Sequence, residues 1–274
     1  MNLILKCFVL SVVVIRYGRA DFRMFFNLEQ VKEYFRNDSS LLANDILYTF
    51  EHECCSMEEK SISKDRRPFI VVEGNHRKSR NVIGMRVARL MRGRYLVHPS
   101  HCLQGFANQL PRGTMFRRAF YLLSMYAISY DVKFHLALGR AVVVNGYWWD
   151  MLTFALVQGY TAEDAPDVTA PDLQIPADLF RPDIIFFLNF PDNLHFNQVT
   201  TRSPVTWKPR VLKMYRDLQD KGEPVSVLNL KGLYRPTIDA VYETVLRNLS
   251  GTRDVWFEDG RVKFDYDGEG KDEE

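Results

Sequence analysis

A segment that follows a short apolar run contains the residue types that bind phosphate groups. Phe69–Val72 is typical of a buried strand and ends at Glu73-Gly74, after which the chain becomes polar and basic. Where a glycine turn leads from a strand into a helix, backbone N–H groups and the positive end of the helix dipole face an anion. The sequence therefore predicts a phosphate-binding loop, made of Gly74, Asn75, His76, Arg77, Lys78, Ser79, Arg80 and Asn81.

The end of this loop differs from the P-loop consensus G-x-x-x-x-G-K-[ST]. Counted from Gly74 without a gap, Ser79 replaces the second glycine, Arg80 the lysine, and Asn81 the hydroxyl residue that binds magnesium. Aligning Lys78-Ser79 with the consensus instead shortens the loop, which would then wrap a triphosphate poorly. Because phosphoryl transfer depends on positioning and electrostatic stabilisation by these groups, and a guanidinium does not replace a lysine, we expect catalysis to be weak or absent.

Arg117-Arg118 marks a second candidate anion site. The pair falls near the start of a helix expected over residues 114–138. Positive side chains at a helix N-terminus oppose the helix dipole, and a bound anion would offset that repulsion. Aromatic residues recur along the same helix, which indicates either a core face or a surface that stacks on a ligand.

Apolar runs alternate with helical patterns along the rest of the chain. Strands are expected at residues 69–72, 95–97, 141–144, 184–188 and 225–230, and helices over residues 82–90, 114–138, 147–156, 207–220 and 236–249. Asn145-Gly146 is compatible with a hairpin, but the helical pattern after it favours a strand-to-helix turn. The order predicts an α/β fold: a P-loop NTPase-like five-stranded parallel sheet with helices on both faces, a small helical segment before it, and an active crevice at the carboxyl ends of the strands.

Composition bounds the function only loosely. The chain has 274 residues, of which 46% are hydrophobic and 26% charged, as expected for a folded globular protein with one main domain. A net charge of +2 does not indicate nucleic-acid binding by itself. The charge is unevenly distributed, however, because one acid-free stretch contains Arg77, Lys78, Arg80, Arg86, Arg89, Arg92 and Arg94.

The four cysteines, Cys7, Cys54, Cys55 and Cys102, show no zinc-binding spacing. Adjacent cysteines such as Cys54 and Cys55 rarely bond to each other. His98-x-x-His101-Cys102 resembles part of a metal site but lacks a fourth ligand, so we predict no metal site.

The two ends of the chain differ in charge. The first 20 residues are apolar, basic and acid-free, typical of an organelle presequence or a secretory signal, and the apolar run is too short for a membrane span. The last 24 residues are rich in acids and glycine, and we expect them to be disordered. The predicted organisation is a targeting segment 1–20, a helical extension 21–56, a linker 57–68, the α/β domain 69–250 and the tail 251–274.

Several stretches resemble one family in their order. Phe69–Gly74, Phe116–Tyr121, Val142–Trp148 and Leu179–Ile185 resemble the thymidylate kinase-like branch of the P-loop nucleoside monophosphate kinases, and are most similar to the mitochondrial UMP-CMP kinase 2 type. The likeness covers roughly residues 21–250, because residues 21–55 also resemble the helical region before that kinase domain.

The resemblance implies ATP and Mg²⁺ as cofactors and assigns roles to residues. It implies catalytic roles for Arg80 and Arg118 and a lid role for Arg202. The acceptor would contact Glu73, Arg117, Arg118, Tyr121 and Tyr147. The chain departs from the family where the third strand ends in Asn145-Gly146 rather than Asp-Arg, and where residues 191–206 supply only Arg202 rather than several lid arginines.

Three functions remain open. The favoured one is a degenerate kinase with weak or absent catalysis, which binds a nucleotide or another small anion. The second is an active kinase that transfers the γ-phosphate of ATP to dTMP, UMP or CMP, or to a nucleoside if Glu73 serves as a base. The third is a binding module, either monomeric or homodimeric, that contacts a protein, a nucleic acid or an anionic surface through the basic stretch. The resemblance favours the mitochondrion, and residues 1–20 leave the secretory pathway open.

Overall fold

The structure is a computed structural model that describes residues 25–55, 61–63, 66–190, 207–230 and 234–250. The predicted targeting segment, the acidic tail, part of the linker and the lid residue Arg202 lie outside these ranges. Within them, no helix combines the length and the hydropathy needed to cross a bilayer.

Five parallel strands form one sheet in the order β2-β3-β1-β4-β5, which confirms the predicted fold class. The strands are β1 (Phe69–Gly74), β2 (Arg94–Val97), β3 (Val142–Asn145), β4 (Ile184–Asn189) and β5 (Val225–Asn229). The central strands β1, β3 and β4 are almost entirely buried, which explains their continuous runs of valine, isoleucine and phenylalanine.

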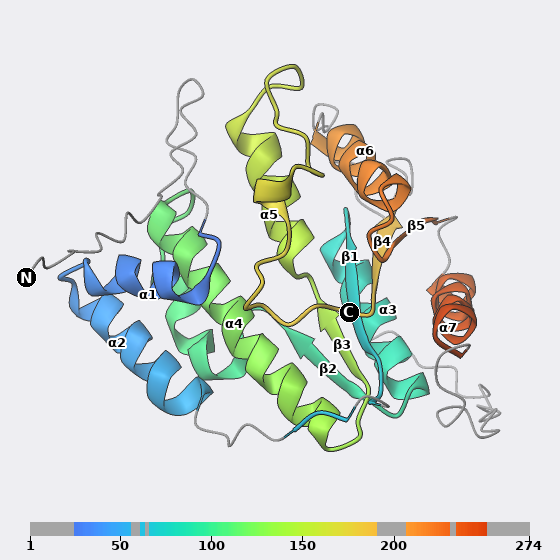
Figure 1. The fold of residues 1–274 in the computed structure, drawn as a ribbon, viewed down its shortest axis with the longest axis horizontal. Coiled ribbons are helices and arrows are strands. Elements are labelled where there is room, and N and C mark those ends of the chain that lie inside the picture. Colours follow the sequence, from blue (N-terminus) through green and yellow to red (C-terminus); the bar gives the residue numbers. More distant parts are fainter. Residues whose placement is uncertain (1–24, 56–60, 64–65, 191–206, 231–233, 251–274) are drawn as a thin grey trace, which may run out of the picture.

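Alternate residues of the strands point to opposite faces, and each face has its own helices (Figure 1). The helices α3 (Arg77–Leu90) and α7 (Tyr234–Ser250) pack on the face that contains Ile70 and Val143. The helices α4 (Met115–Ala137), α5 (Trp148–Gly159) and α6 (Trp207–Asp220) pack on the face that contains Val71 and Val144. Two 3₁₀ helices, η2 (His101–Gln109) and η3 (Pro171–Leu173), lie in the connections.

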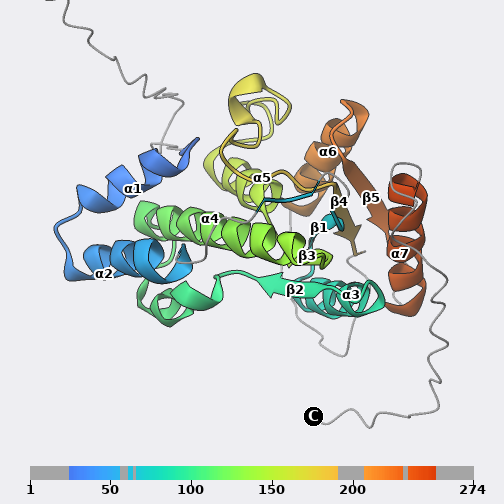
Figure 2. The same ribbon diagram turned by 60° about the horizontal axis from the view of Figure 1, so that its bottom comes forward.

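The N-terminal helices α1 (Leu28–Arg36) and α2 (Leu41–Thr49), with the π-helical turn η1 (Phe50–Cys54), lie beside α4 (Figures 1 and 2). Their buried residues share one hydrophobic cluster with α4 and the sheet. A disulfide joins Cys54 to Cys102 and so ties this extension to η2. The sequence did not indicate this pairing, and it removes Cys102 from the His98-x-x-His101-Cys102 pattern as a metal ligand.

One boundary differs from the expectation in a way that matters for the site. The sequence suggested a polar loop up to Asn81, but α3 begins at Arg77, so only Asn75 and His76 connect it to β1. The prediction for Asn145-Gly146 is confirmed: β3 leads through this turn into α5, and Gly146 has a φ of 78°.

Candidate functional site

A cleft of about 890 Å³ lies at the carboxyl ends of β1, β2 and β3. Its walls come from the first turn of α3, the segment after β2, the N-terminal turn of α4 and the face of α5. This is where ligands bind to open parallel sheets, at the ends of neighbouring strands.

The β1–α3 turn is closed by its own hydrogen bonds. The Asn75 side chain donates to Asn189 Oδ1 at 3.0 Å and to the Phe190 carbonyl at 2.9 Å, and it accepts from the Phe190 N–H at 2.8 Å. The Asn75 N–H also donates to the carbonyl of Leu188. The turn is therefore fastened to the end of β4 rather than available to surround a phosphate group.

Within the predicted loop, the backbone conformation and its surroundings require glycine at position 74. Its φ is 147°, and a Cβ at this position would lie 2.3 Å from the carbonyl oxygen of Leu188. No other residue fits between the two strands without displacing the backbone.

The first turn of α3 is capped from within the chain. His76 is the N-cap, and its Nδ1 accepts from the Ser79 N–H at 3.3 Å and lies 2.6 Å from Ser79 Oγ. Ser79 is buried, and its hydroxyl is also 3.3 Å from the Tyr234 hydroxyl on α7. Burial, helped by the positive charges of Lys208 and Lys78, lowers the pKa of His76, which keeps the ring neutral and its Nδ1 able to accept.

Arg80 and Asn81 are engaged by other side chains. Arg80 Nη1 forms an ion pair with Asp150 Oδ1 at 2.7 Å, and the arginine side chain is only 13% exposed. Asn81 Oδ1 accepts from the Tyr95 hydroxyl at 3.1 Å and from the side-chain amide of Asn145. Arg77 and Lys78 remain exposed, and of these two only Arg77 borders the cleft.

These contacts allow a test of whether the residues fit MgATP. The oxygen atoms nearest the consensus positions, those of Ser79 and Asn81, already accept or share hydrogen bonds. The residues present do not form a P-loop site for MgATP.

Glu73 is buried and acts as a cap for α5. Its carboxylate accepts from the N–H groups of Tyr147 at 2.8 Å and Asp150 at 3.2 Å, and from the Tyr215 hydroxyl at 2.6 Å. The N-cap residue of α5, Tyr147, makes no capping hydrogen bond with its own side chain. Burial first and the negative charge of Asp150 second raise the pKa of Glu73 to about 7. Because Glu73 does not border the cleft, its position argues against a role as a base.

The N-terminal turn of α4 forms the opposite wall. Arg117 donates to the carbonyls of Ala107 and Leu110 at 3.3 and 3.0 Å and to the Tyr121 hydroxyl at 3.1 Å, and it lies over the Tyr121 ring. Arg117 therefore fastens the loop before α4. Its neighbour Arg118 borders the cleft, and the Arg118 side chain has no hydrogen bond or ion pair to any described residue.

Tyr147 is also part of the predicted acceptor site, and its contacts stabilise the packing of neighbouring segments. It is buried, its hydroxyl donates to the Phe180 carbonyl at 2.9 Å, and its ring packs on Phe69. Of the predicted acceptor residues, Arg117, Arg118, Tyr121 and Tyr147 come together around the cleft, whereas Glu73 lies behind it.

The cleft residues that were not singled out from the sequence as ligand-binding include His98, Arg112 and Asp150. Asp150 follows the Asn145-Gly146 turn by one helical turn, which is the signal that could have identified it. Arg112 lies in a Pro-Gly loop that only the fold brings to the cleft.

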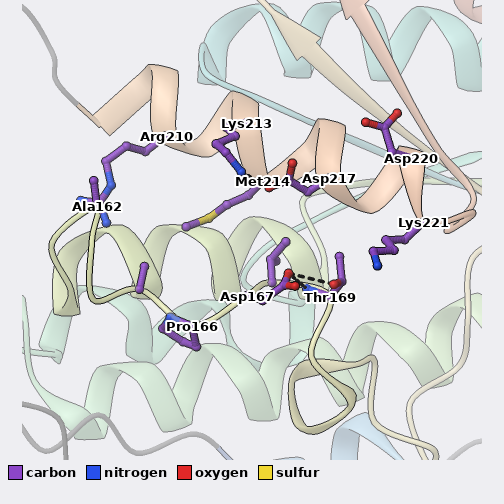
Figure 3. Close-up of a pocket in the computed structure, with 12 residues that line it drawn as sticks. Ala162, Pro166, Asp167, Thr169, Arg210, Lys213, Met214, Asp217, Asp220 and Lys221 are labelled. Carbon is purple, nitrogen blue, oxygen red and sulfur yellow. Dashed lines mark hydrogen bonds and ion pairs between the residues drawn. The ribbon is translucent and has the colours of Figure 1, made fainter.

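A second, smaller pocket of about 460 Å³ lies between α6 and the segment that follows α5 (Figure 3). Several of its polar groups already have partners: Lys213 pairs with Asp217 at 2.6 Å, and Asp167 accepts from the N–H and hydroxyl of Thr169. Arg210 donates to the carbonyls of Tyr160 and Thr161. These satisfied groups make the larger cleft the better candidate site.

Comparison with protein-family models and with curated proteins finds no match. Among solved structures, the thymidylate kinase from Candida albicans is similar, with a TM-score of 0.52 and 12% identity over 67% of this chain and 92% of that one. The thymidylate kinase from Ehrlichia chaffeensis gives a TM-score of 0.46 and 14% identity over 67% and 98%. The chain therefore has a thymidylate kinase-like fold.

Proposed function

We propose that this protein is a relative of the nucleoside monophosphate kinases, of the UMP-CMP kinase 2 type, that binds a nucleoside monophosphate or a similar small phosphorylated anion and transfers phosphoryl groups weakly or not at all. The observation that carries the proposal is the contrast between the two walls of the cleft. The β1–α3 turn uses its polar groups internally, whereas Arg118 on α4 has no partner among the described residues.

The closed turn is the reason to expect little catalysis. Kinases of this kind accelerate phosphoryl transfer mainly by positioning the phosphates and stabilising their charge. A two-residue turn whose side chains bond to β4 and to α3 cannot also surround a triphosphate. Arg80 does not substitute for the missing lysine, because Asp150 neutralises it.

The wall formed by the N-terminal turn of α4, which we call the open wall, is the reason to expect anion binding. Arg118 lies in the first turn of α4, where its charge opposes the helix dipole. Arg112 and Arg77 add two exposed positive charges at the edge of the same cleft. A phosphate placed between them gains attraction from each, and 890 Å³ lies within the usual range of small-molecule sites.

Isothermal titration calorimetry on the full chain tests the proposal. UMP, CMP or dTMP should bind, and ATP with Mg²⁺ should not bind at millimolar concentration. Arg118→Ala should weaken nucleoside monophosphate binding about tenfold, as expected for a lost charge-assisted contact. Arg86→Ala is the matched control, because Arg86 is an exposed arginine on α3 that does not border the cleft.

Two results would overturn the proposal. The first is ADP release that depends on one acceptor and reaches roughly the 1–100 s⁻¹ typical of active kinases, which would indicate a working enzyme. The second is the absence of any monophosphate binding, which would favour a binding module for larger partners. If Arg118→Ala binds UMP as tightly as the unmodified chain does, Arg118 is not part of the binding site.

We also propose that the protein works in an oxidising compartment, which favours the secretory alternative over a reducing mitochondrial matrix. The support is the Cys54–Cys102 disulfide, since such bonds persist mainly in oxidising environments. Alkylation of cell extracts under non-reducing conditions tests this: Cys102 should be protected, and a freely alkylated Cys102 would contradict it.

A further inference from the structure

Three buried polar atoms around the cleft have no hydrogen-bond partner among the described residues: Arg80 Nε, His98 Nε2 and Asn145 Oδ1. They come from α3, from the end of β2 and from the end of β3, and all three residues border the cleft. Burying a polar atom without a partner costs roughly 1–3 kcal/mol. Three such atoms beside one cleft indicate that something polar completes them there. We call these three residues the floor of the cleft.

The floor is polar but carries almost no net charge. The Arg80 guanidinium is paired with Asp150. His98 is neutral at physiological pH, because burial lowers its pKa to about 4 despite the attraction of nearby Asp150. Ser124 Oγ accepts from the Ser100 N–H at 2.7 Å and lies 3.5 Å from His98 Nδ1, and the tautomer of the ring decides whether His98 Nε2 donates or accepts. The floor therefore offers a donor at Arg80 Nε, an acceptor at Asn145 Oδ1 and one or the other at His98 Nε2.

The rim of the cleft, formed by Arg77, Arg112 and Arg118, is strongly positive. The side chains of these three arginines have no hydrogen bond or ion pair to a described residue. The chain from Gly74 to Tyr130 contains no aspartate or glutamate, so no nearby acid in sequence offsets them.

Charge thus separates the two zones. A phosphate group on the floor would face the Asp150 carboxylate and the Asn145 carbonyl oxygen, whereas the rim arginines have no carboxylate partner among the described residues. A neutral group with both a donor and acceptors suits the floor, and the dianion suits the rim. Each unpartnered atom is out of contact with bulk solvent, so a small side-chain rotation accompanies binding.

We propose that a nucleoside monophosphate binds with its phosphate at the rim arginines and its uncharged, hydrogen-bonding part at the floor formed by Arg80, His98 and Asn145. This orientation rests on the proposed function, and it adds which end of the bound nucleotide faces the floor and which faces the rim. The inward part is a sugar hydroxyl or the amide-like edge of a base, since both present a donor beside an acceptor.

Calorimetry with three probes on the full chain tests the orientation: UMP, ribose 5-phosphate and inorganic phosphate. His98→Leu removes the polar Nε2 atom while keeping a side chain of similar size. It should lower UMP affinity about tenfold, the usual effect of one lost buried hydrogen bond, and phosphate affinity less than twofold. Arg118→Gln should lower the affinity for all three probes. Loss of ribose 5-phosphate affinity in His98→Leu would assign the sugar to the floor, and its retention would assign the base; either supports the proposal.

Asn145→Ala provides a second floor variant should His98→Leu fail to fold, which circular dichroism would reveal. Phosphate affinity that falls as much as UMP affinity in a folded floor variant would place the phosphate inward and overturn the orientation. UMP affinity unchanged in both folded floor variants would also overturn it. In these cases the unmodified chain still binds UMP and the proposed function stands. If the unmodified chain binds none of the probes, the proposed function and the orientation fail together.

Discussion

The two walls of the cleft both carry basic side chains, and they differ in what those side chains contact. On the α3 wall, Arg80 is paired with Asp150 and the helix N-terminus is capped by His76. On the α4 wall, Arg117 fastens a loop so that Arg118 next to it stays unpaired among the described residues. The comparison shows that a count of positive charges does not locate an anion site. What matters is which charges remain without an internal partner.

The largest effect, on the free energy of unfolding, should come from releasing η2, the segment that precedes the open α4 wall. Cys102→Ser removes the disulfide to Cys54, which spans 48 residues. Loop-closure entropy predicts a loss of about 4 kcal/mol in the free energy of unfolding, measured by urea denaturation without reductant. The matched control is Cys55→Ser, because Cys55 is a free thiol whose pKa burial raises to about 11. Equal destabilisation by both variants would contradict the assigned pairing.

The buried carboxyl behind the closed wall should make stability depend on pH. The pKa of Glu73 is about 7 in the folded state against an ordinary value of 4.5, so the folded state holds the extra proton between these values. Its contribution to stability is therefore present at pH 5 and is lost as the pH rises through 7. The full shift corresponds to about 3 kcal/mol.

Comparison with Glu73→Gln isolates this effect, because glutamine stays neutral at every pH. The free energy of unfolding of Glu73→Gln, relative to the unmodified chain, should increase by about 2–3 kcal/mol between pH 5 and pH 8. Guanidinium denaturation at both pH values measures it. A difference that does not change with pH would show that Glu73 is ionised throughout.

The smallest effect is expected from lengthening the β1–α3 turn, which would open the closed α3 wall. Inserting Ala-Gly between Arg77 and Lys78 produces the spacing G-x-x-x-x-G-K-S from Gly74 to Ser79. If loop length is the main defect, the affinity for ATP with Mg²⁺ should rise at least about tenfold, as for one regained charge-assisted contact. An inserted Ala-Ala pair is the control, because it restores the length without the glycine. Equal gains from both insertions would show that the glycine is unimportant, and no gain from either would place the defect elsewhere.

Much of the fold could be predicted because local pattern and burial agree. The continuous apolar runs of β1, β3 and β4 are buried on both faces, and α6 lies over residues 207–220 as expected. The start of α3 could not be predicted, since residues 77–81 are polar and basic and show no apolar period. Their helical state depends on the His76 cap and on the burial of Ser79 against Tyr234, which is 155 residues away in sequence.

The candidate site was predicted in part. Arg118 was identified from its place near a helix N-terminus, a local property. The partners of Asn75, Arg80 and Asn81 were not predictable, because they lie on β4, α5 and β2. His98 and Arg112 were missed as ligand-binding candidates for the same reason, since only the packing of the segments after β2 and before α4 brings them to the cleft.

The sequence by itself determined the order of strands and helices, the glycine turns that end β1 and β3, and the departure from the P-loop consensus, because these depend on neighbouring residues and on hydrophobic periodicity. The tertiary structure alone decided that the β1–α3 turn is closed, that Glu73 is buried, that Cys54 pairs with Cys102 and that the Arg118 side chain finds no partner within the part of the chain that the structure describes. The physical reason is that each of these depends on whether a polar group finds a partner from a distant segment, and such partners exist only after the sheet and helices have packed.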